Sequence, residues 1–559
     1  MIGPRPATRS VGVVRPRHRR GGDGGTRPPP GPAVTGRRGG SLSPIPHGRA
    51  LAIGVACVCL AAGAVAPTPD ALTTAGQYAV ATTSFAAVLW VTGAVPLSLT
   101  ALSIPVVLTT VGVYPDFADA VAGFADPVVF LLLAGFMLAE ALQTHGIDRR
   151  IAFAILVRFG TSPRGLVLGV MVATALLSMV VSNTATVAMM VPVVLGIVGT
   201  VTDVAEFDAD RAADAPAGSN LQIAMLLGVA YAASLGGVGT LVGTPPNAIV
   251  VGQLDDLVGV EITFVEWLAV GLPMVTVTLP VAWVLLTYVA YPPEPFDVSR
   301  ARERARHQRR SMGRLSAPAR RTVVVFGATA SLWVLGGLGF LFVDPLPRAW
   351  HVTLFGGTGT NAFGTVGHQG VLFYVLVGLL AVPALVVSGA ADWDDLLDVD
   401  WGTLLLLGGG LSLANALADT NATRWLAEVA FGSLVGSPIV VVLLVVVTVT
   451  VVVGELASNT AMAALLAPVL VTVGPAYAAT LGTSSEVASV MLAVTGAVAA
   501  SYGFALPVAT PPNAIVFGAG HLRREHMLRA GTLLDAVVIG LTVAVASLLV
   551  GSVWPIVLG

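Results

Sequence analysis

About eleven apolar stretches, each long enough for a helix that crosses a lipid bilayer, account for most of this 559-residue chain. A crossing helix needs about 20 predominantly apolar residues. The chain is 55% hydrophobic and only 11% charged, which excludes an ordinary soluble protein. We therefore predict an all-α polytopic membrane protein. The stretches lie near 50–66, 75–95, 96–114, 126–143, 219–250, 264–290, 322–343, 367–388, 400–418, 485–518 and 530–556.

Arginine placement predicts how these helices are oriented in the membrane. Residues 1–49 are rich in Arg, Pro and Gly and are expected to form a disordered cytoplasmic tail with no cleaved signal. Further arginines cluster at 149–164, 300–321 and 523–529, which are alternate connections. Positive charge accumulates on the cytoplasmic side, so the N-terminus is expected inside and, after eleven crossings, the C-terminus outside.

A short polar phrase occurs twice inside apolar sequence. Ser182-Asn183-Thr184 precedes Thr244-Pro245-Pro246-Asn247, and Ser458-Asn459-Thr460 precedes Thr510-Pro511-Pro512-Asn513. The segments 163–201 and 435–474 are interpreted as re-entrant helical hairpins, and 219–250 and 485–518 as broken helices. Duplicated breaks at matching places of two halves indicate a transporter binding site.

The order of these elements predicts the domain organisation. A first repeat at 115–291 and a second within 322–559 are joined by a cytoplasmic linker at 292–321, and residues 50–114 precede both. The first repeat enters its hairpin from inside and the second from outside. The two copies therefore have inverted topology, which brings both polar phrases near the bilayer midplane.

The residue types in both phrases suit a cation and an anion together. Hydroxyl, amide and freed backbone oxygens are ligands for hard cations such as Na⁺, and amide hydrogens and helix N-termini can hold an anion. No arginine lies in either tip or break, so a dianion would need mobile cations to compensate its charge. The plainer interpretation, a helix cap or an interhelical polar patch, is less favoured because the phrase is duplicated.

Other polar residues in the apolar stretches carry weaker predictions. Glu455 is expected to have a structural or charge-balancing role, with proton coupling as the alternative, because a carboxylate within the bilayer must be paired, protonated or hydrated. Glu140 and Asn415 occupy the same repeat position and are expected to make polar contacts between helices. Cys57 and Cys59 are expected to be packed or lipid-facing thiols. The net charge of −2 gives no indication of nucleic-acid binding.

These motifs resemble the divalent anion:sodium symporter family, which carries dicarboxylates, citrate or sulfate. The stretch ASYGFALPVATPPNAIV (500–516) is similar to the signature of that family. The resemblance implies a homodimer, with 50–114 as the first scaffold helices and a transport domain that moves as an elevator. It also implies roles for particular residues. The sodium ligands would be Ser178, Ser182, Asn183, Gly243, Gly454, Ala457, Asn459 and Ala509. The substrate contacts would be Asn183, Thr184, Thr244, Asn459, Thr460 and Thr510.

The leading hypothesis is therefore sodium-driven symport of a small divalent anion, most favourably a C4-dicarboxylate. A proton-coupled or arsenite-type anion exporter is the alternative, and a passive channel fits the duplicated breaks less well. An enzyme is not expected, because the chain lacks a His-Glu-x-x-His zinc motif and an intramembrane aspartyl-protease signature.

Overall fold

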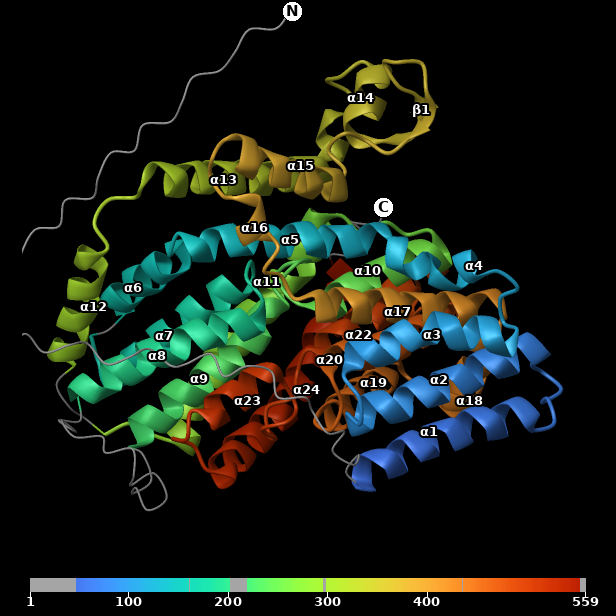
Figure 1. Ribbon diagram of the computed structural model, residues 1–559, viewed down its shortest axis with the longest axis horizontal. Helices are drawn as coiled ribbons and strands as arrows, with labels where there is room; N and C mark the ends of the chain where they lie inside the picture. Colours follow the sequence, from blue (N-terminus) through green and yellow to red (C-terminus); the bar gives the residue numbers. More distant parts are fainter. Residues whose placement is uncertain (1–46, 160, 202–218, 295–297, 435, 553–559) are drawn as a thin grey trace, which may run out of the picture. The chain divides into compact units, whose positions relative to one another are not determined.

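The computed structural model describes residues 47–559 apart from 160, 202–218, 295–297, 435 and 553–559. The predicted tail, except for residues 47–49, and the predicted loop after residue 201 lie outside the described residues. Within the described part the chain is almost entirely helical, as predicted, and one small two-stranded sheet is present (Figure 1).

The first half of the chain contains two helices at each predicted hairpin and each predicted break. Its elements are α1 (His47–Val65), α2 (Thr74–Thr92), α3 (Leu97–Val111), α4 (Phe117–Val121), η1 (Ala122–Ala125), α5 (Pro127–Thr144), α6 (Ile147–Phe159), α7 (Pro163–Ser178), α8 (Asn183–Val201), α9 (Asn220–Gly237), α10 (Pro245–Val258), α11 (Phe264–Val284) and η3 (Leu285–Ala290).

The second half begins with a helical connection and also has two helices at its predicted hairpin and at its predicted break. Its elements are α12 (Ser299–Ser311), α13 (Ala317–Gly337), η4 (Gly339–Phe342), α14 (Arg348–Phe355), β1 (Gly357–Thr360), β2 (Val366–His368), α15 (Tyr374–Val387), α16 (Trp393–Leu396), α17 (Trp401–Asp419), α18 (Ala422–Phe431), η5 (Gly432–Leu434), α19 (Ile439–Gly454), α20 (Asn459–Val473), η6 (Gly474–Tyr477), α21 (Ala478–Leu481), α22 (Ser485–Ala500), α23 (Pro511–Gly518) and α24 (Arg524–Ser552).

All eleven predicted apolar stretches contain helices, but their lengths differ. Among the described residues, seven helices are long and apolar enough to cross a membrane, or up to eight if one bent pair counts as a single span. Several of the others, including α3 and α15, are apolar helices of fewer than 18 residues. The total of eleven crossings therefore stays a prediction.

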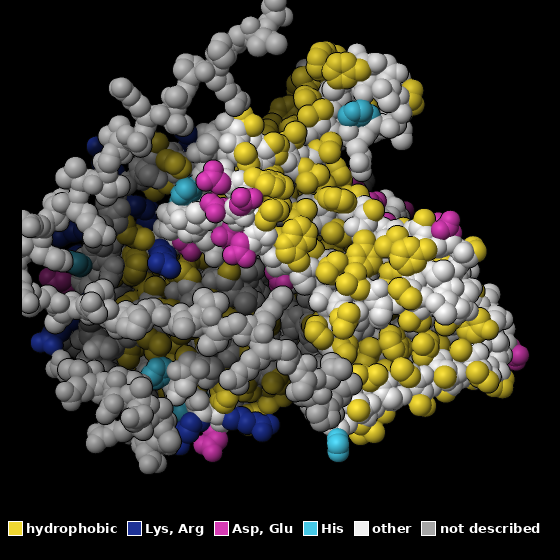
Figure 2. All heavy atoms as spheres, viewed as in Figure 1, with side chains coloured by type: hydrophobic (Ala, Val, Ile, Leu, Met, Phe, Trp, Pro, Cys, Tyr) yellow, Lys and Arg dark blue, Asp and Glu magenta, His cyan; other side chains and the backbone are white. Residues whose placement is uncertain are grey.

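Apolar side chains cover the outside of several of these helices. α1 has one buried residue, Ala56, while Leu51 and Val65 are 71% and 84% exposed. Figure 2 shows hydrophobic side chains spread over the visible face of α1 to α3 and of α13 and α15. A helix that is apolar around its whole circumference and exposed is expected to face lipid.

The predicted linker contains a helix that the sequence analysis did not anticipate. α12 is rich in arginine, yet Ala301 and Ala305 are buried where it packs on α6 and α8. Arg302 Nε donates to the Val157 carbonyl at 3.2 Å. Small residues four positions apart lie on the same face of a helix and allow close packing there. The arginine-rich composition of the segment does not indicate this face.

The antiparallel β1–β2 hairpin between α14 and α15 was also not anticipated, because its strands contain four and three residues and carry several glycines. Strands this short have no detectable alternation of apolar and polar residues.

Candidate functional site

Each predicted hairpin tip lies at a junction between two helices. α7 ends at Ser178 and α8 begins at Asn183, while α19 ends at Gly454 and α20 begins at Asn459. Ser182 immediately precedes α8, and Ser458 immediately precedes α20. Ala457 lies in the turn between α19 and α20. Both phrases therefore place an asparagine and a threonine at a helix N-terminus, where backbone N–H groups have no partner within the helix.

The two proline pairs open helices and do not interrupt them. α9 ends at Gly237 and α10 begins at Pro245, and α22 ends at Ala500 before α23 begins at Pro511. Proline is tolerated in the first helical turn because its missing N–H would have no partner there. The predicted sodium-ligand backbones at Gly243 and Ala509 lie in the connecting loops, directly before Thr244 and Thr510.

The two breaks have the same hydrogen-bond pattern. Asn247 Nδ2 donates to the carbonyls of Gly237 at 3.0 Å and Thr240 at 2.8 Å. Asn513 Nδ2 donates to the carbonyls of Gly503 at 3.0 Å and Leu506 at 2.9 Å. In both copies the acceptors precede the asparagine by ten and seven residues. The last asparagine of Thr-Pro-Pro-Asn therefore holds each loop closed across its break.

These asparagines were in the quoted motif but were not predicted as site residues. Asn247 and Asn513 are both 0% exposed, and the Oδ1 atom of each has no hydrogen-bond partner within the described part of the chain. A buried acceptor without a partner is costly unless a ligand satisfies it. The occurrence of this asparagine in both Thr-Pro-Pro-Asn motifs could have indicated its role from the sequence.

The first tip is tied to the first break by several close contacts. Ser178 Oγ donates to the Ala233 carbonyl at 2.9 Å and also to Asn183 Oδ1. The Thr240 hydroxyl donates to the Met179 carbonyl. Gly237 lies so close to the Asn183 amide that a Cβ atom there would be 2.6 Å from Asn183 Oδ1. Ser178, which is buried, and Asn183, which is half-buried, thus bring side-chain oxygens together at the first tip.

At the second tip a carboxylate accepts hydrogen bonds from the loop of the second break, whereas at the first tip a backbone carbonyl accepts one from the loop of the first break. Glu455 Oε1 accepts the Ala505 N–H at 2.9 Å, and Oε2 accepts the Leu506 N–H at 2.7 Å. Its repeat counterpart is Met179, whose carbonyl binds Thr240 in the first copy. Glu455 therefore anchors the second break, which supports the predicted structural role. The carboxyl of Asp535 in α24 lies near that of Glu455.

The predicted substrate residues differ in exposure. Thr244 and Thr510 are 3% and 2% exposed, whereas Thr184 is exposed. The Thr510 hydroxyl accepts the Asn513 N–H at 3.2 Å and so also acts as the N-cap of α23. Asn459 Oδ1 is buried with no partner among the described residues. The second tip and both breaks thus each have a buried side-chain oxygen without a partner among the described residues, near a helix N-terminus.

Packing between the repeats brings tips and breaks of different copies together. α8, which begins with Asn183, packs against α23, which begins with Pro511. α20, which begins with Asn459, packs against α10, which begins with Pro245. Each tip helix therefore contacts the break helix of the other repeat. The described residues contain no group of three or more His, Cys, Asp or Glu that could hold a metal.

An acidic contact joins α10 to α5 beyond the apolar part of the broken helix. The carboxyls of Asp256 and Asp126 lie close together, and Asn415 in α17 lies near Asp256. Burial, followed by the nearby charges of Asp126 and Asp255, raises the pKa of Asp256 from its ordinary 3.8 to about 7. Glu140 accepts a hydrogen bond from Thr144 in its own helix, so the polar contacts between helices expected of Glu140 and Asn415 stay a prediction.

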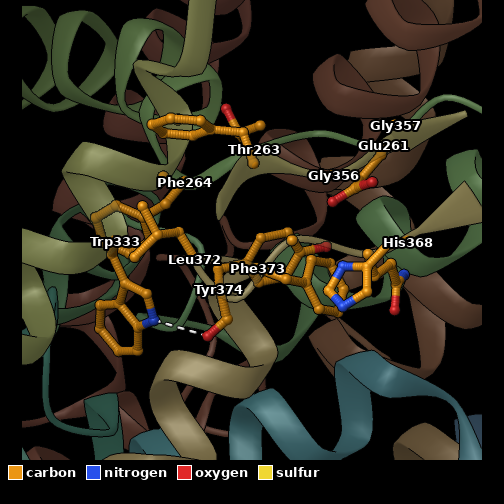
Figure 3. Close-up of a pocket in the computed structure, with 15 residues that line it drawn as sticks. Glu261, Thr263, Phe264, Trp333, Gly356, Gly357, His368, Leu372, Phe373 and Tyr374 are labelled. Atoms are coloured by element: carbon orange, nitrogen blue, oxygen red, sulfur yellow. Dashed lines mark hydrogen bonds between the residues drawn. The ribbon is translucent and has the colours of Figure 1, made fainter. Parts of the chain in front are cut away.

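A separate cavity of about 110 Å³ lies between the start of α11, the end of α13 and the segment leading into α15 (Figure 3). Glu261, Thr263 and His368 line it, and Trp333 Nε1 donates to the Tyr374 carbonyl at 2.8 Å. None of the motif residues lines this cavity. It is therefore distinct from the paired tips and breaks.

Comparison with known proteins identifies the family. Residues 49–559 match the family model described as the sodium:sulfate symporter transmembrane region. The chain belongs to this family of sodium-coupled anion symporters. The predicted membership is thus confirmed, and Na⁺ as the predicted co-transported ion agrees with it.

Two relatives have names that specify a substrate class. A sodium-dependent dicarboxylate transporter of Staphylococcus saprophyticus is 33% identical over 481 residues, covering 85% of this chain and 87% of the relative. A protein of the same name from Staphylococcus aureus is 32% identical over 497 residues, covering 88% of each.

Two solved structures share the fold at low sequence identity. The Alcanivorax borkumensis YdaH transporter has a TM-score of 0.53 and 17% identity, covering 91% of this chain and 99% of that structure. Neisseria gonorrhoeae MtrF has a TM-score of 0.51 and 13% identity, covering 90% and 95%. They support a transporter fold for the sodium:sulfate symporter family member described here.

Proposed function

We propose that this symporter imports a small divalent anion together with Na⁺, and that a C4-dicarboxylate is its preferred substrate. The names of the two staphylococcal relatives support the substrate class. The chemistry of the tips agrees, because two facing sets of neutral donors suit an anion with a carboxylate at each end.

The observation that carries this proposal is the crossed packing of two equivalent breaks. The same asparagine bonds close both loops, and α8–α23 and α10–α20 join each tip to the opposite break. A duplicated site of this kind offers two similar cation positions around one anion. We assign the first to Ser178, Ser182, Asn183 and the Gly243 backbone. The second is assigned to Gly454, Ala457, Asn459 and the Ala509 backbone.

The substrate is held by neutral groups. We assign its carboxylates to the amides and hydroxyls of the tips, with the break threonines beside them. These residues are Asn183, Thr184, Thr244, Asn459, Thr460 and Thr510. Since no arginine lies in either tip or either break, the anion binds weakly until Na⁺ supplies positive charge. Each ligand therefore raises the affinity for the other, which is the thermodynamic basis of coupling.

The proposal includes the larger architecture. It comprises eleven crossings with two re-entrant hairpins, a cytoplasmic N-terminus, an external C-terminus and a homodimer. The tip and break helices would move together against α1 to α3, α5, α13, α15 and α17 as an elevator. Inverted repeats are the usual basis of such alternating access.

Uptake into liposomes tests the proposed function. We expect labelled succinate to accumulate under an inward Na⁺ gradient and not under a matched K⁺ gradient. Unlabelled malate should compete more strongly than sulfate. Accumulation driven equally well by a proton gradient without Na⁺ would favour the proton-coupled alternative and contradict the proposal.

A further inference from the structure

A groove of about 570 Å³ lies between the beginning of α7 and the end of the α11–η3 helix, away from the tips and breaks. Arg164 and Leu168 line it from α7, and Trp283 and Tyr288 line it from α11 and η3. Its walls are therefore largely apolar or aromatic, with one positive charge at one end.

The position of Arg164 is fixed by the opposite wall. Its guanidinium carbon lies 4.1 Å from the centroid of the Tyr288 ring, and its backbone carbonyl accepts the Trp283 Nε1 hydrogen at 2.9 Å. Its Nε makes a long 3.4 Å contact with the Thr287 carbonyl. Among the described residues no carboxylate forms an ion pair with Arg164. The terminal guanidinium nitrogens therefore remain available to an anion.

The groove lies where a membrane span ends. α11 and η3 together form a 27-residue candidate span, Phe264–Ala290, and Trp283 and Tyr288 lie near its end. Tyr288 is 50% exposed and Val289 is 52% exposed. Tryptophan and tyrosine concentrate at the level of the lipid headgroups. The apolar part of the groove is thus placed beside acyl chains and Arg164 beside phosphates.

We propose that this groove binds an anionic phospholipid, with the phosphate against the Arg164 guanidinium and an acyl chain along Leu168. Arginine matches phosphate geometry through paired N–H donors. The groove is separate from the residues assigned to the transported anion, so the inference does not depend on the transport proposal. A bound lipid would brace α7, whose far end carries Ser178, against α11.

Native mass spectrometry of the purified full-length protein tests this inference. Phosphatidylglycerol and phosphatidylcholine would each be titrated against the wild type, Arg164→Gln and Arg164→Lys. We expect one phosphatidylglycerol molecule to bind the wild type more tightly than phosphatidylcholine, and Arg164→Gln to weaken it about fivefold. Arg164→Lys should retain most of the preference, because the positive charge remains.

Arg529→Gln provides the matched control. Arg529 is also stacked on a tyrosine, 5.5 Å from the Tyr291 ring centroid, but it does not line this groove. This variant should bind phosphatidylglycerol as the wild type does. Equal binding of both lipids to the wild type, or an equal loss in Arg529→Gln, would overturn the inference.

Discussion

Replacement of Glu455 by glutamine tests how the second break is held. The carboxylate accepts two backbone N–H groups at 2.9 and 2.7 Å. Glutamine keeps one acceptor oxygen but turns an NH₂ group toward the other backbone donor. Hydrogen bonds to a charged group contribute about 1.5–3 kcal/mol each, and an unsatisfied buried donor costs about 1–3 kcal/mol. The break should therefore lose about 2–4 kcal/mol of local stability.

Two assays measure the consequence of Glu455→Gln. The melting temperature in detergent should fall, and the Na⁺ concentration for half-maximal uptake should rise about tenfold or more, since 1.4 kcal/mol corresponds to a factor of ten. Glu455→Asp, which keeps the charge on a shorter side chain, serves as the comparison and should lose less stability. An unchanged melting temperature together with uptake that no longer depends on pH would refute the anchoring role and favour proton coupling.

Further substitutions test three other parts of the structure. Asn247→Ala and Asn513→Ala each remove two hydrogen bonds donated by a buried amide. Each should lower the free energy of unfolding by about 2–4 kcal/mol and so lower the melting temperature. A lower melting temperature in only one of the two variants would contradict the equivalence of the two breaks. The raised pKa of Asp256 means that its contribution to stability is complete below 3.8 and is lost as pH rises through about 7. The melting temperature should therefore fall between about pH 4 and 7 and level off above that range, and Asp256→Asn should flatten this fall; an identical profile in the variant would contradict the assignment. A Cβ atom at Gly236 would lie 2.4 Å from the Ala175 carbonyl, whereas one at Gly196 meets nothing within 4 Å. Gly236→Ala should thus separate α7 from α9 and abolish uptake, Gly196→Ala should preserve it, and equal activity of the two variants would contradict the close packing.

The sequence predicted the positions of the helices well because apolar length is a local property. It also predicted both helix junctions, since Ser182 and Ser458 precede helix starts in the structure. The crossed packing of α8 on α23 and of α20 on α10 was not predictable in detail, because it depends on contacts between distant segments. The bonds of Asn247 and Asn513 were missed for the same reason.

Helix α12 was not predicted from the sequence because its segment is highly charged. The arginines of α12 suggested a plain linker, and only the packing of Ala301 and Ala305 shows why a helix forms there. The role of Glu455 required the structure as well, because its partners lie about 50 residues away in the chain.

The most direct test of the central claim is succinate uptake by proteoliposomes containing Asn183→Ala or Asn459→Ala, with and without an inward Na⁺ gradient. Asn220→Ala serves as the control, because Asn220 begins α9 and donates to the Pro292 carbonyl at a distance from both tips. We expect sodium-driven uptake in the wild type and in Asn220→Ala, and loss of that uptake in each tip variant. Sodium-driven uptake that survives in both tip variants would contradict the two-tip site.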